Sequence, residues 1–109
     1  MAQLIDGLVL CHVGDHRLAV RAQDVDAFEH DPLGATYVGE RFGDDPTPPE
    51  GVRVLRCGAQ RLAVDRLDVH GGVALLPAPP LLSSAFGGGI LGFVEVRQLL
   101  WPVVIPERL

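Results

Sequence analysis

A repeated stretch constrains the fold of this chain more than any other feature. Residues 8–25 and 52–69 align at a constant offset of 44, and seven of the eighteen aligned positions are identical. Average residue usage would give about one identity by chance. Two copies are too few for a solenoid, which needs at least about three repeats. We therefore expect a single domain, 1–109, that is made of two related halves.

Each copy has the form of a β-hairpin followed by a third extended piece. Two short apolar runs flank a turn that begins with glycine, which is the pattern of a hairpin. An isolated hairpin is marginally stable in water, so the two copies must share a core or build adjoining small barrels. The expected strands are 7–13 and 16–21 around Gly14, the matching runs around Gly58, and the extended pieces 22–28 and 67–76, the second bent at Gly71-Gly72.

The segments between the copies divide the chain at a linker rich in proline. Residues 44–51 separate a first half, 1–43, from a second half, 52–109. Residues 1–6 are expected to fray, and 22–29 suit either one helical turn or extended chain. Three more predictions complete the layout: 35–43 begins extended and ends in a helical turn at Gly43, 81–86 forms another turn, and 90–96 pairs with 98–105. The predicted core contains Val54, Leu62, Val64 and Leu67.

Composition excludes several classes of function. The net charge of −5 argues against nucleic acid, because neutralisation of phosphates supplies most of that affinity. The longest apolar runs are too short to span a bilayer, and the first residues lack the basic region of a signal peptide. We expect a cytoplasmic protein without direct membrane insertion. In that setting Cys11 and Cys57 are expected to be reduced thiols, although a disulfide between them remains an alternative.

No residue pattern indicates catalysis or a cofactor. Gly87, Gly89 and Gly92 match the letters of a dinucleotide fingerprint, but a strand-like run follows them where that motif needs a helix. The four histidines show no ligand spacing with the cysteines, so no metal site is predicted. The acidic residues around 24–31 lack the glycine that a calcium loop requires. We expect no enzyme activity and no cofactor.

Four segments of the chain resemble CheW-type coupling proteins, which link chemoreceptors to the histidine kinase in bacterial chemosensory arrays. Residues 8–25 are similar to the family's opening strand, turn and strand, and 40–43 (Glu-Arg-Phe-Gly) resembles the end of its Asp-Leu-Arg segment. Residues 62–67 resemble its Val-Asp strand, and 77–79, 90–92 and 107–109 follow its closing order. The resemblance implies an all-β, CheW-like fold of two related small antiparallel β-barrel halves.

The chain also departs from the family pattern. Asp31–Ala35 stands where the family has a strand, a loop and another strand, so the first barrel is expected to be truncated. Tyr37 and Gly39 replace the Asp and Arg of the Asp-Leu-Arg segment. A short, divergent member is implied, similar to the truncated CheW-like adaptor of myxobacterial Frz-type systems.

The resemblance implies a non-catalytic adaptor that binds the helical tip of a methyl-accepting chemoreceptor. Contact with the histidine kinase is expected to be weak or absent, because the missing unit belongs to its docking region. Other CheW-like proteins are further expected partners. The expected receptor-binding residues are Val25, Asp26, Phe28, Glu29, Tyr37 and Phe42, with the last two on an exposed apolar rim.

Two alternatives stay open at this point. Val25 and Phe28 suit core packing as well as a surface role. A different class of function is a small β-barrel that binds a low-molecular-weight ligand in the space left by the missing strands.

Overall fold

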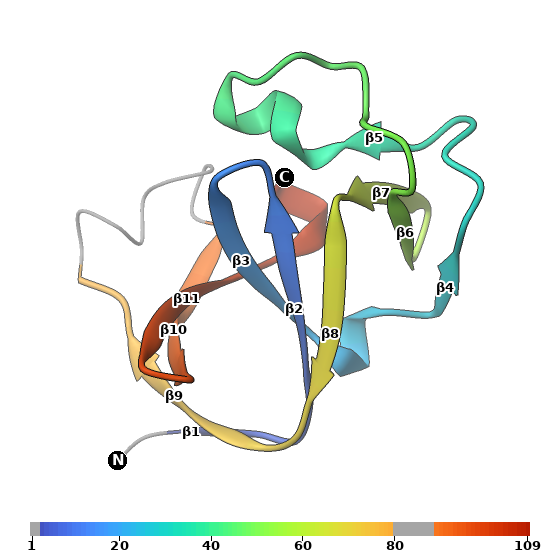
Figure 1. Cartoon of the computed structure of the whole chain (residues 1–109). Coiled ribbons are helices and arrows are strands. Elements are labelled where there is room, and N and C mark those ends of the chain that lie inside the picture. Colours follow the sequence, from blue (N-terminus) through green and yellow to red (C-terminus); the bar gives the residue numbers. More distant parts are fainter. Residues whose placement is uncertain (1–2, 80–88) are drawn as a thin grey trace.

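The computed structural model describes residues 3–79 and 89–109, and these form eleven strands in two sheets (Figure 1). The described part of the chain contains no α-helix, so the all-β prediction is confirmed, and its short helical turns are neither long nor apolar enough to cross a membrane. The strands are β1 (Gln3–Ile5), β2 (Leu8–Val13), β3 (His16–Arg21), β4 (Ala27–Glu29), β5 (Thr36–Tyr37), β6 (Arg53–Cys57), β7 (Gln60–Val64), β8 (Arg66–His70), β9 (Val73–Pro77), β10 (Ile90–Val96) and β11 (Leu99–Val104), and the 3₁₀-helices are η1 (Ala22–Asp24), η2 (Val38–Phe42) and η4 (Pro106–Arg108).

The two predicted hairpins are present at matching positions of the repeat. β2 pairs antiparallel with β3, and β6 pairs antiparallel with β7. Gly14 and Gly58 begin the two turns with φ of 58° and 61°, a conformation that glycine adopts without steric cost. The predicted final pair also forms, as β10 with β11. The predicted turn at 81–86 lies outside the described residues.

The two copies exchange strands, so the sheets do not follow the two halves of the sequence. β8 follows the second hairpin in the chain, yet it pairs with β2 of the first hairpin. In the same way β4 follows the first hairpin and pairs with β6 of the second. Each sheet therefore combines the hairpin of one copy with the strands that follow the other copy.

The larger sheet curls into a barrel. Its order is β1-β9-β10-β11-β3-β2-β8, and β8 and β9 are two parts of one strand that bends at Gly71-Gly72 as predicted (Figure 1). The expectation that residues 1–6 fray is wrong for Gln3–Ile5, because β1 pairs with β9 and buries Ile5. The interior of the barrel holds a core of Ile5, Leu8, Leu10, Ala19, Val94, Val96, Trp101 and Val103.

The smaller sheet is an open version of the same arrangement. It has the order β4-β6-β7-β5, and β5 pairs parallel with β7 just as β11 pairs parallel with β3. The other strand pairs are antiparallel, as expected; these two are parallel because each strand returns to the outer side of a hairpin from the other copy. β5 has two residues where β11 has six, and no described strand corresponds to β10. The smaller sheet is therefore unclosed between β4 and β5.

A second core lies between the two sheets and is shared by both copies. β2 contributes Val9, Cys11 and Val13 to it, and β6 contributes Val54, Leu55 and Cys57. The core predictions for Val54, Leu62 and Val64 are confirmed. Leu67 is half-buried instead, because β8 lies at one end of the larger sheet. Cys11 and Cys57 are buried free thiols, and burial raises the pKa of both, that of Cys57 to about 11.

The side chain of Arg61, on β7, connects β4 and the loop after it to the smaller sheet. Its guanidinium donates a hydrogen bond of 2.9 Å to Oε1 of Glu29 on β4. The same group donates to the backbone carbonyl oxygens of Asp31, at 2.7 Å, and of Leu33. The loop that follows β4 is thus held over the smaller sheet by Arg61.

Arg17 is the repeat equivalent of Arg61, and its surroundings differ. It lies over the ring of Trp101, with 5.8 Å from its guanidinium carbon to the ring centroid, and makes one long hydrogen bond of 3.5 Å to the carbonyl of Leu100. Here β10 and β11 complete the barrel, so no loop needs to be held. The same residue therefore has a structural role in one copy and a solvent-exposed position in the other.

Substitution of these two equivalent arginines should have unequal effects on stability. We expect Arg61→Ala to lower the free energy of unfolding by about 2–3 kcal/mol, because hydrogen bonds to a charged group are lost together. Arg17→Ala should cost less than about 1 kcal/mol, the scale of an exposed cation–π contact. Urea denaturation of both variants measures the difference. Equal losses would show that Arg61 does not hold the loop.

Candidate docking surfaces

The structure separates the six predicted receptor-binding residues into two groups. Val25, Asp26, Phe28 and Glu29 lie on or just before β4, which pairs with β6. Tyr37 and Phe42 lie on β5 and η2, on the other side of the hairpin, because β5 pairs with β7. The six residues therefore do not form one continuous surface.

Tyr37 is not part of an exposed rim, and that expectation is wrong. Its side chain is buried, and its hydroxyl donates a hydrogen bond of 2.6 Å to Oδ1 of Asp65. The ring packs so closely on Gly39 that a Cβ atom there would lie 2.5 Å from a ring carbon. Burial, followed by the hydrogen bond to Asp65, raises the pKa of the Tyr37 hydroxyl to about 12. Tyr37 thus anchors β5 and η2 to the smaller sheet.

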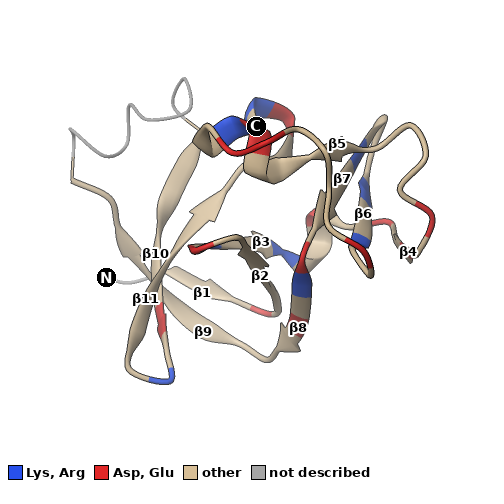
Figure 2. Cartoon of the chain, turned by 45° about the horizontal axis from the view of Figure 1, so that its top comes forward, with Lys and Arg blue, Asp and Glu red and all other residues tan. Residues whose placement is uncertain are grey.

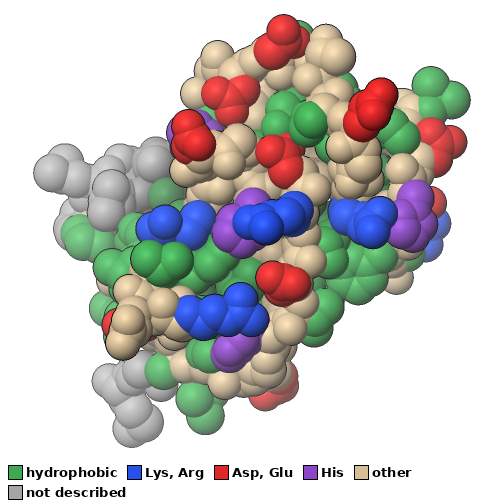
Figure 3. All heavy atoms as spheres, in the orientation of Figure 1, with side chains coloured by type: hydrophobic (Ala, Val, Ile, Leu, Met, Phe, Trp, Pro, Cys, Tyr) green, Lys and Arg blue, Asp and Glu red, His purple; other side chains and the backbone are tan. Residues whose placement is uncertain are grey.

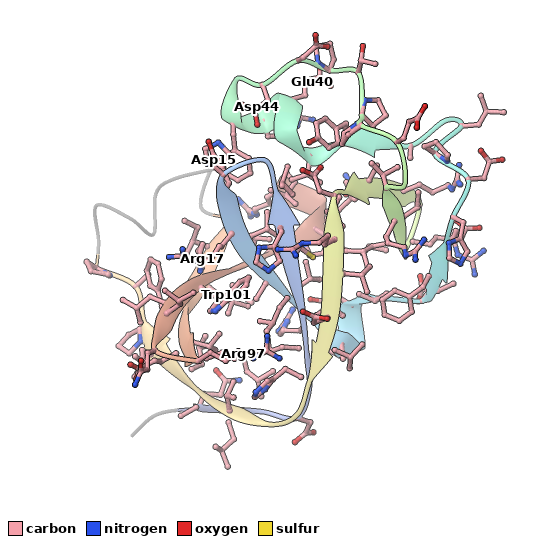
Figure 4. The ribbon with its side chains drawn as sticks, viewed as in Figure 1. Asp15, Arg17, Glu40, Asp44, Arg97 and Trp101 are labelled. Carbon is pink, nitrogen blue, oxygen red and sulfur yellow. The ribbon has the colours of Figure 1, made fainter. Side chains whose placement is uncertain are left out.

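Phe42 also has a structural contact. It is half-buried, and its ring stacks on His16 of the first hairpin with 4.3 Å between the centroids. Nε2 of His16 lies 3.8 Å from a carboxylate oxygen of Asp44, just after η2. These contacts hold η2 against the turn between β2 and β3 (Figure 4).

Among the residues near β4, Phe28 has the most exposed apolar side chain. Phe28 is 51% exposed, whereas Val25 is half-buried and packs against the core between the sheets. The two acids have internal partners: Asp26 accepts a hydrogen bond of 2.8 Å from the backbone N–H of Gly58, and Glu29 pairs with Arg61. Phe28 is therefore the residue of this group that is most available to a partner.

β8 supplies apolar residues that the sequence prediction did not include. Val69 is 69% exposed and Leu67 is half-buried. Val69 is the repeat equivalent of Val25, so the offset of 44 could have identified it. The start of η1 and the end of β8 both lie close to Gly7. A Cβ atom added to Gly7 would lie 3.2 Å from the Cβ of Ala22 and 3.8 Å from the carbonyl oxygen of His70.

The pairing registers place these apolar residues at the edge of one core layer. Val69 pairs with Val9 and Leu67 pairs with Cys11, and both partners belong to the core between the sheets. Phe28 pairs with Leu55 of the same core. Because paired residues share a face of a sheet, the two sets of side chains flank this core from the two sheets. We call Val25, Phe28, Leu67 and Val69 the apolar rim.

The opposite face of β8 is charged and belongs to the open end of the barrel. His12 pairs with Arg17 and with Arg66, so these side chains share the face that leads into the barrel. The ring of His12 meets Trp101 edge-on, with 5.1 Å between the centroids. Arg97, in the turn between β10 and β11, lies 3.9 Å from Asp68 of β8. We call His12, Arg17, Arg66, Asp68, Arg97 and Trp101 the barrel mouth.

The barrel mouth has a positive electrostatic environment within an acidic chain. Burial and then the charge of Arg66 lower the pKa of His12, and Arg17 and Arg97 act in the same direction, while Asp68 opposes them. A hollow of about 460 Å³ lies over His12, Arg66, Asp68 and Arg97, and it is also lined by Gly51, Arg53, Asp65 and Leu67. Figure 3 shows a row of basic and histidine side chains crossing this face, with acidic side chains above it.

The charges are segregated along the molecule. Arg17 and Arg97 flank Trp101 at the mouth, whereas Asp15, Glu40 and Asp44 surround the β2–β3 turn and η2 (Figure 4). A view turned by 45° shows a basic tip on the β10–β11 hairpin and both signs of charge near η2 and the C-terminus (Figure 2).

A small hollow lies beside Arg61 on the smaller sheet. The hollow beside Arg61 has a volume of about 200 Å³ and is lined by Gly34, Thr36, Arg41, Ala59, Gln60, Arg61, Leu62 and Leu109. Small-molecule sites usually measure about 300–1,000 Å³. Among the described residues no group of three or more His, Cys, Asp and Glu side chains could hold a metal ion.

Comparison with solved structures identifies the fold. The chain matches the crystal structure of the scaffolding protein TtCheW from Thermoanaerobacter tengcongensis, with a TM-score of 0.64 and 14% identity. The fold is that of a CheW protein. The match covers 96% of this chain and 90% of the solved chain, so the two matched chains are close in length. No protein-family model matches the sequence, and a search of curated proteins finds no match.

The hydroxyl of Tyr37 should titrate well above an ordinary tyrosine. The chain has a single tyrosine, so the absorbance of the phenolate reports this residue alone. We expect a midpoint near pH 12, because the raised pKa in the folded state favours the neutral form. Stability from this group is complete below about pH 10, the unfolded pKa, and is lost as the pH rises through the folded value.

Tyr37→Phe provides the control for this titration. It should lower the free energy of unfolding by about 1 kcal/mol at neutral pH, because the hydrogen bond to Asp65 is lost. Between about pH 10 and 12 its stability should fall less than that of the parent. A phenolate midpoint at the ordinary value in the folded parent would contradict the buried, bonded hydroxyl.

Proposed function

We propose that this chain is a non-catalytic adaptor of a bacterial chemosensory array and binds the helical tip of a chemoreceptor. The observation that carries the proposal is the apolar rim, where Phe28 and Val69 are exposed on either side of the core between the sheets. The CheW-like fold supports the class of function, since the solved chain with this fold is described as a scaffolding protein.

The chemistry of the apolar rim suits an amphipathic helix. A helix binds such a surface by placing apolar residues of one face against it. Val25, Phe28, Leu67 and Val69 come from two different sheets, so a helix lying along the rim would contact both. Exposed apolar surface of this kind has a cost in water that binding removes. Asp26 and Glu29 flank the rim, and their negative charges disfavour acidic residues of a partner at these positions.

Weak coupling to the kinase is the second part of the proposal. It rests on the smaller sheet, in which β5 is short and no described strand corresponds to β10 of the larger sheet. The adaptor has a complete barrel at one end and an open sheet at the other, so the surfaces that it offers to partners at these two ends differ in structure. We propose that the open end is the one that would otherwise dock the kinase.

Phe28→Glu should abolish binding to the receptor while leaving the fold intact. A carboxylate buried against an apolar helix without a partner is strongly unfavourable. Because Phe28 is half-exposed, the free energy of unfolding should change by no more than about 1 kcal/mol. A pull-down with the cytoplasmic hairpin of the receptor, together with urea denaturation, measures both quantities.

Leu4→Glu is the matched control for that experiment. Leu4 is exposed on β1, which pairs with β9, and it is not part of the apolar rim, so its charge should not affect receptor binding. The kinase should be captured weakly by the parent and by both variants. Receptor binding that survives Phe28→Glu would rule out the apolar rim. Strong capture of the kinase without receptor would rule out weakened coupling.

A further inference from the structure

We infer that the barrel mouth is a second docking surface and binds an acidic segment of a protein partner. The segment would carry at least two carboxylates and an apolar side chain between them. The charged side chains of this surface lie on the opposite face of β8 from the apolar rim, because Arg66 and Asp68 alternate with Leu67 and Val69; the two surfaces adjoin at Leu67, which also lines the hollow. An adaptor with both surfaces could hold two partners on the two sides of one strand.

The concentration of arginine at the mouth is the first observation. Four of the nine basic residues, all arginines, lie in or beside it: Arg17, Arg53, Arg66 and Arg97. Two acids, Asp65 and Asp68, line the same hollow, so the four arginines outnumber them. Asp65 accepts hydrogen bonds from the backbone of Gly14 and from Tyr37, and the guanidinium of Arg53 lies 2.7 Å from Nδ1 of His30. Asp68 is 3.9 Å from Arg97, a long ion pair between two exposed side chains. Arg66 makes no ion pair within residues 3–79 and 89–109.

The backbone at Arg97 is the second observation. Arg97 and Gln98 form the two-residue turn between β10 and β11 with φ of 54° and 66°. Such a turn favours Gly or Asn at both positions, and a larger side chain in this conformation carries a steric cost. The chain nevertheless places a long basic side chain there, directed to the barrel mouth and the carboxylate of Asp68.

The third observation is apolar surface beside the basic groups. Leu99 and Leu100 follow the turn and are both substantially exposed. The backbone carbonyl of Leu100 accepts the hydrogen bond from Arg17, whereas the Leu100 side chain lies on the other face of β11, opposite Glu95. Leu99 is the leucine on the same face as Trp101, which is buried in the barrel and supports the guanidinium of Arg17. Arginine with apolar neighbours is typical of protein interfaces, and the planar guanidinium matches carboxylate geometry.

The spacing of the groups favours a peptide segment over a small anion or nucleic acid. The arginines come from β3, β6, β8 and the β10–β11 turn, and those of β6, β8 and the turn line one hollow. A small anion needs donors that converge on one point. A nucleic acid is longer and more densely charged than a short acidic segment, so it would extend beyond the row onto the acidic side chains above it (Figure 3).

The chain contains its own probe for this test. Trp101 is the one tryptophan, and it touches both Arg17 and His12, so its fluorescence should respond to an occupant of the mouth. The full chain is titrated at low salt with a short peptide of alternating Glu and Leu, and with the matched Gln and Leu peptide. We expect saturable binding of the Glu peptide alone, weakened by salt.

Three variants give the proposal its specificity. Arg66→Glu and Arg97→Gly should each weaken binding by about fivefold or more, the scale of an exposed charge interaction. Arg97→Gly should also leave the free energy of unfolding unchanged or raised, because glycine relieves the turn. Arg41→Glu, which makes the same charge change on η2, should bind the peptide as the parent does.

Several results would overturn the inference. If the Glu peptide does not bind at low salt, the barrel mouth is not a docking surface for acidic segments. An equal loss with Arg41→Glu would show an effect of net charge without a site. Competition by inorganic phosphate at concentrations similar to those of the peptide would identify a small-anion hollow, and tighter binding of a single-stranded oligonucleotide would identify a nucleic-acid surface.

Discussion

The pairing of β2 on both edges is the constraint on which the rest of this structure depends. β2 lies between β3 and β8, so its hairpin partner comes from its own copy of the repeat and its other neighbour comes from the second copy. Leu8 and Leu10 face the interior of the barrel, and Val9 and Cys11 face the core between the sheets. A strand buried on both faces needs an unbroken apolar run, which 8–11 provides. Neither copy can therefore fold without strands from the other.

Exchange of strands also explains how two copies of one sequence reached different forms. In the larger sheet β10 and β11 complete a barrel, and Arg17 is released to the surface. In the smaller sheet the loop at 31–35 takes that place, and Arg61 holds its carbonyl groups and Glu29. Arginine is suited to the second role because its rigid fork reaches several acceptors at once. The same residue type at equivalent positions of the repeat thus has different roles, because strands complete the sheet beside Arg17 and a loop lies beside Arg61.

Local features of the fold could be predicted from the sequence, and the pairing between the copies could not. Gly14, Gly43 and Gly58 marked turns whose geometry glycine favours, so both hairpins and the end of η2 were predicted. Tyr37 was misplaced because its partner, Asp65, lies 28 positions away in the sequence. The strand β1 was missed for a related reason, since Gln3–Ile5 becomes ordered by pairing with distant β9. Both errors involve long-range contacts that short sequence windows do not contain.

The alternation of residues along β8 connects the fold to its proposed roles. Arg66 and Asp68 point to the barrel mouth, and Leu67 and Val69 point to the apolar rim, as the period of a strand requires. The sequence shows this alternation, but only the exchange of strands reveals that both faces of β8 are accessible. A slip of one residue in the pairing of β8 with β2 would exchange the two sets of side chains. The burial of Leu67 against the inter-sheet core therefore fixes the register that presents both surfaces.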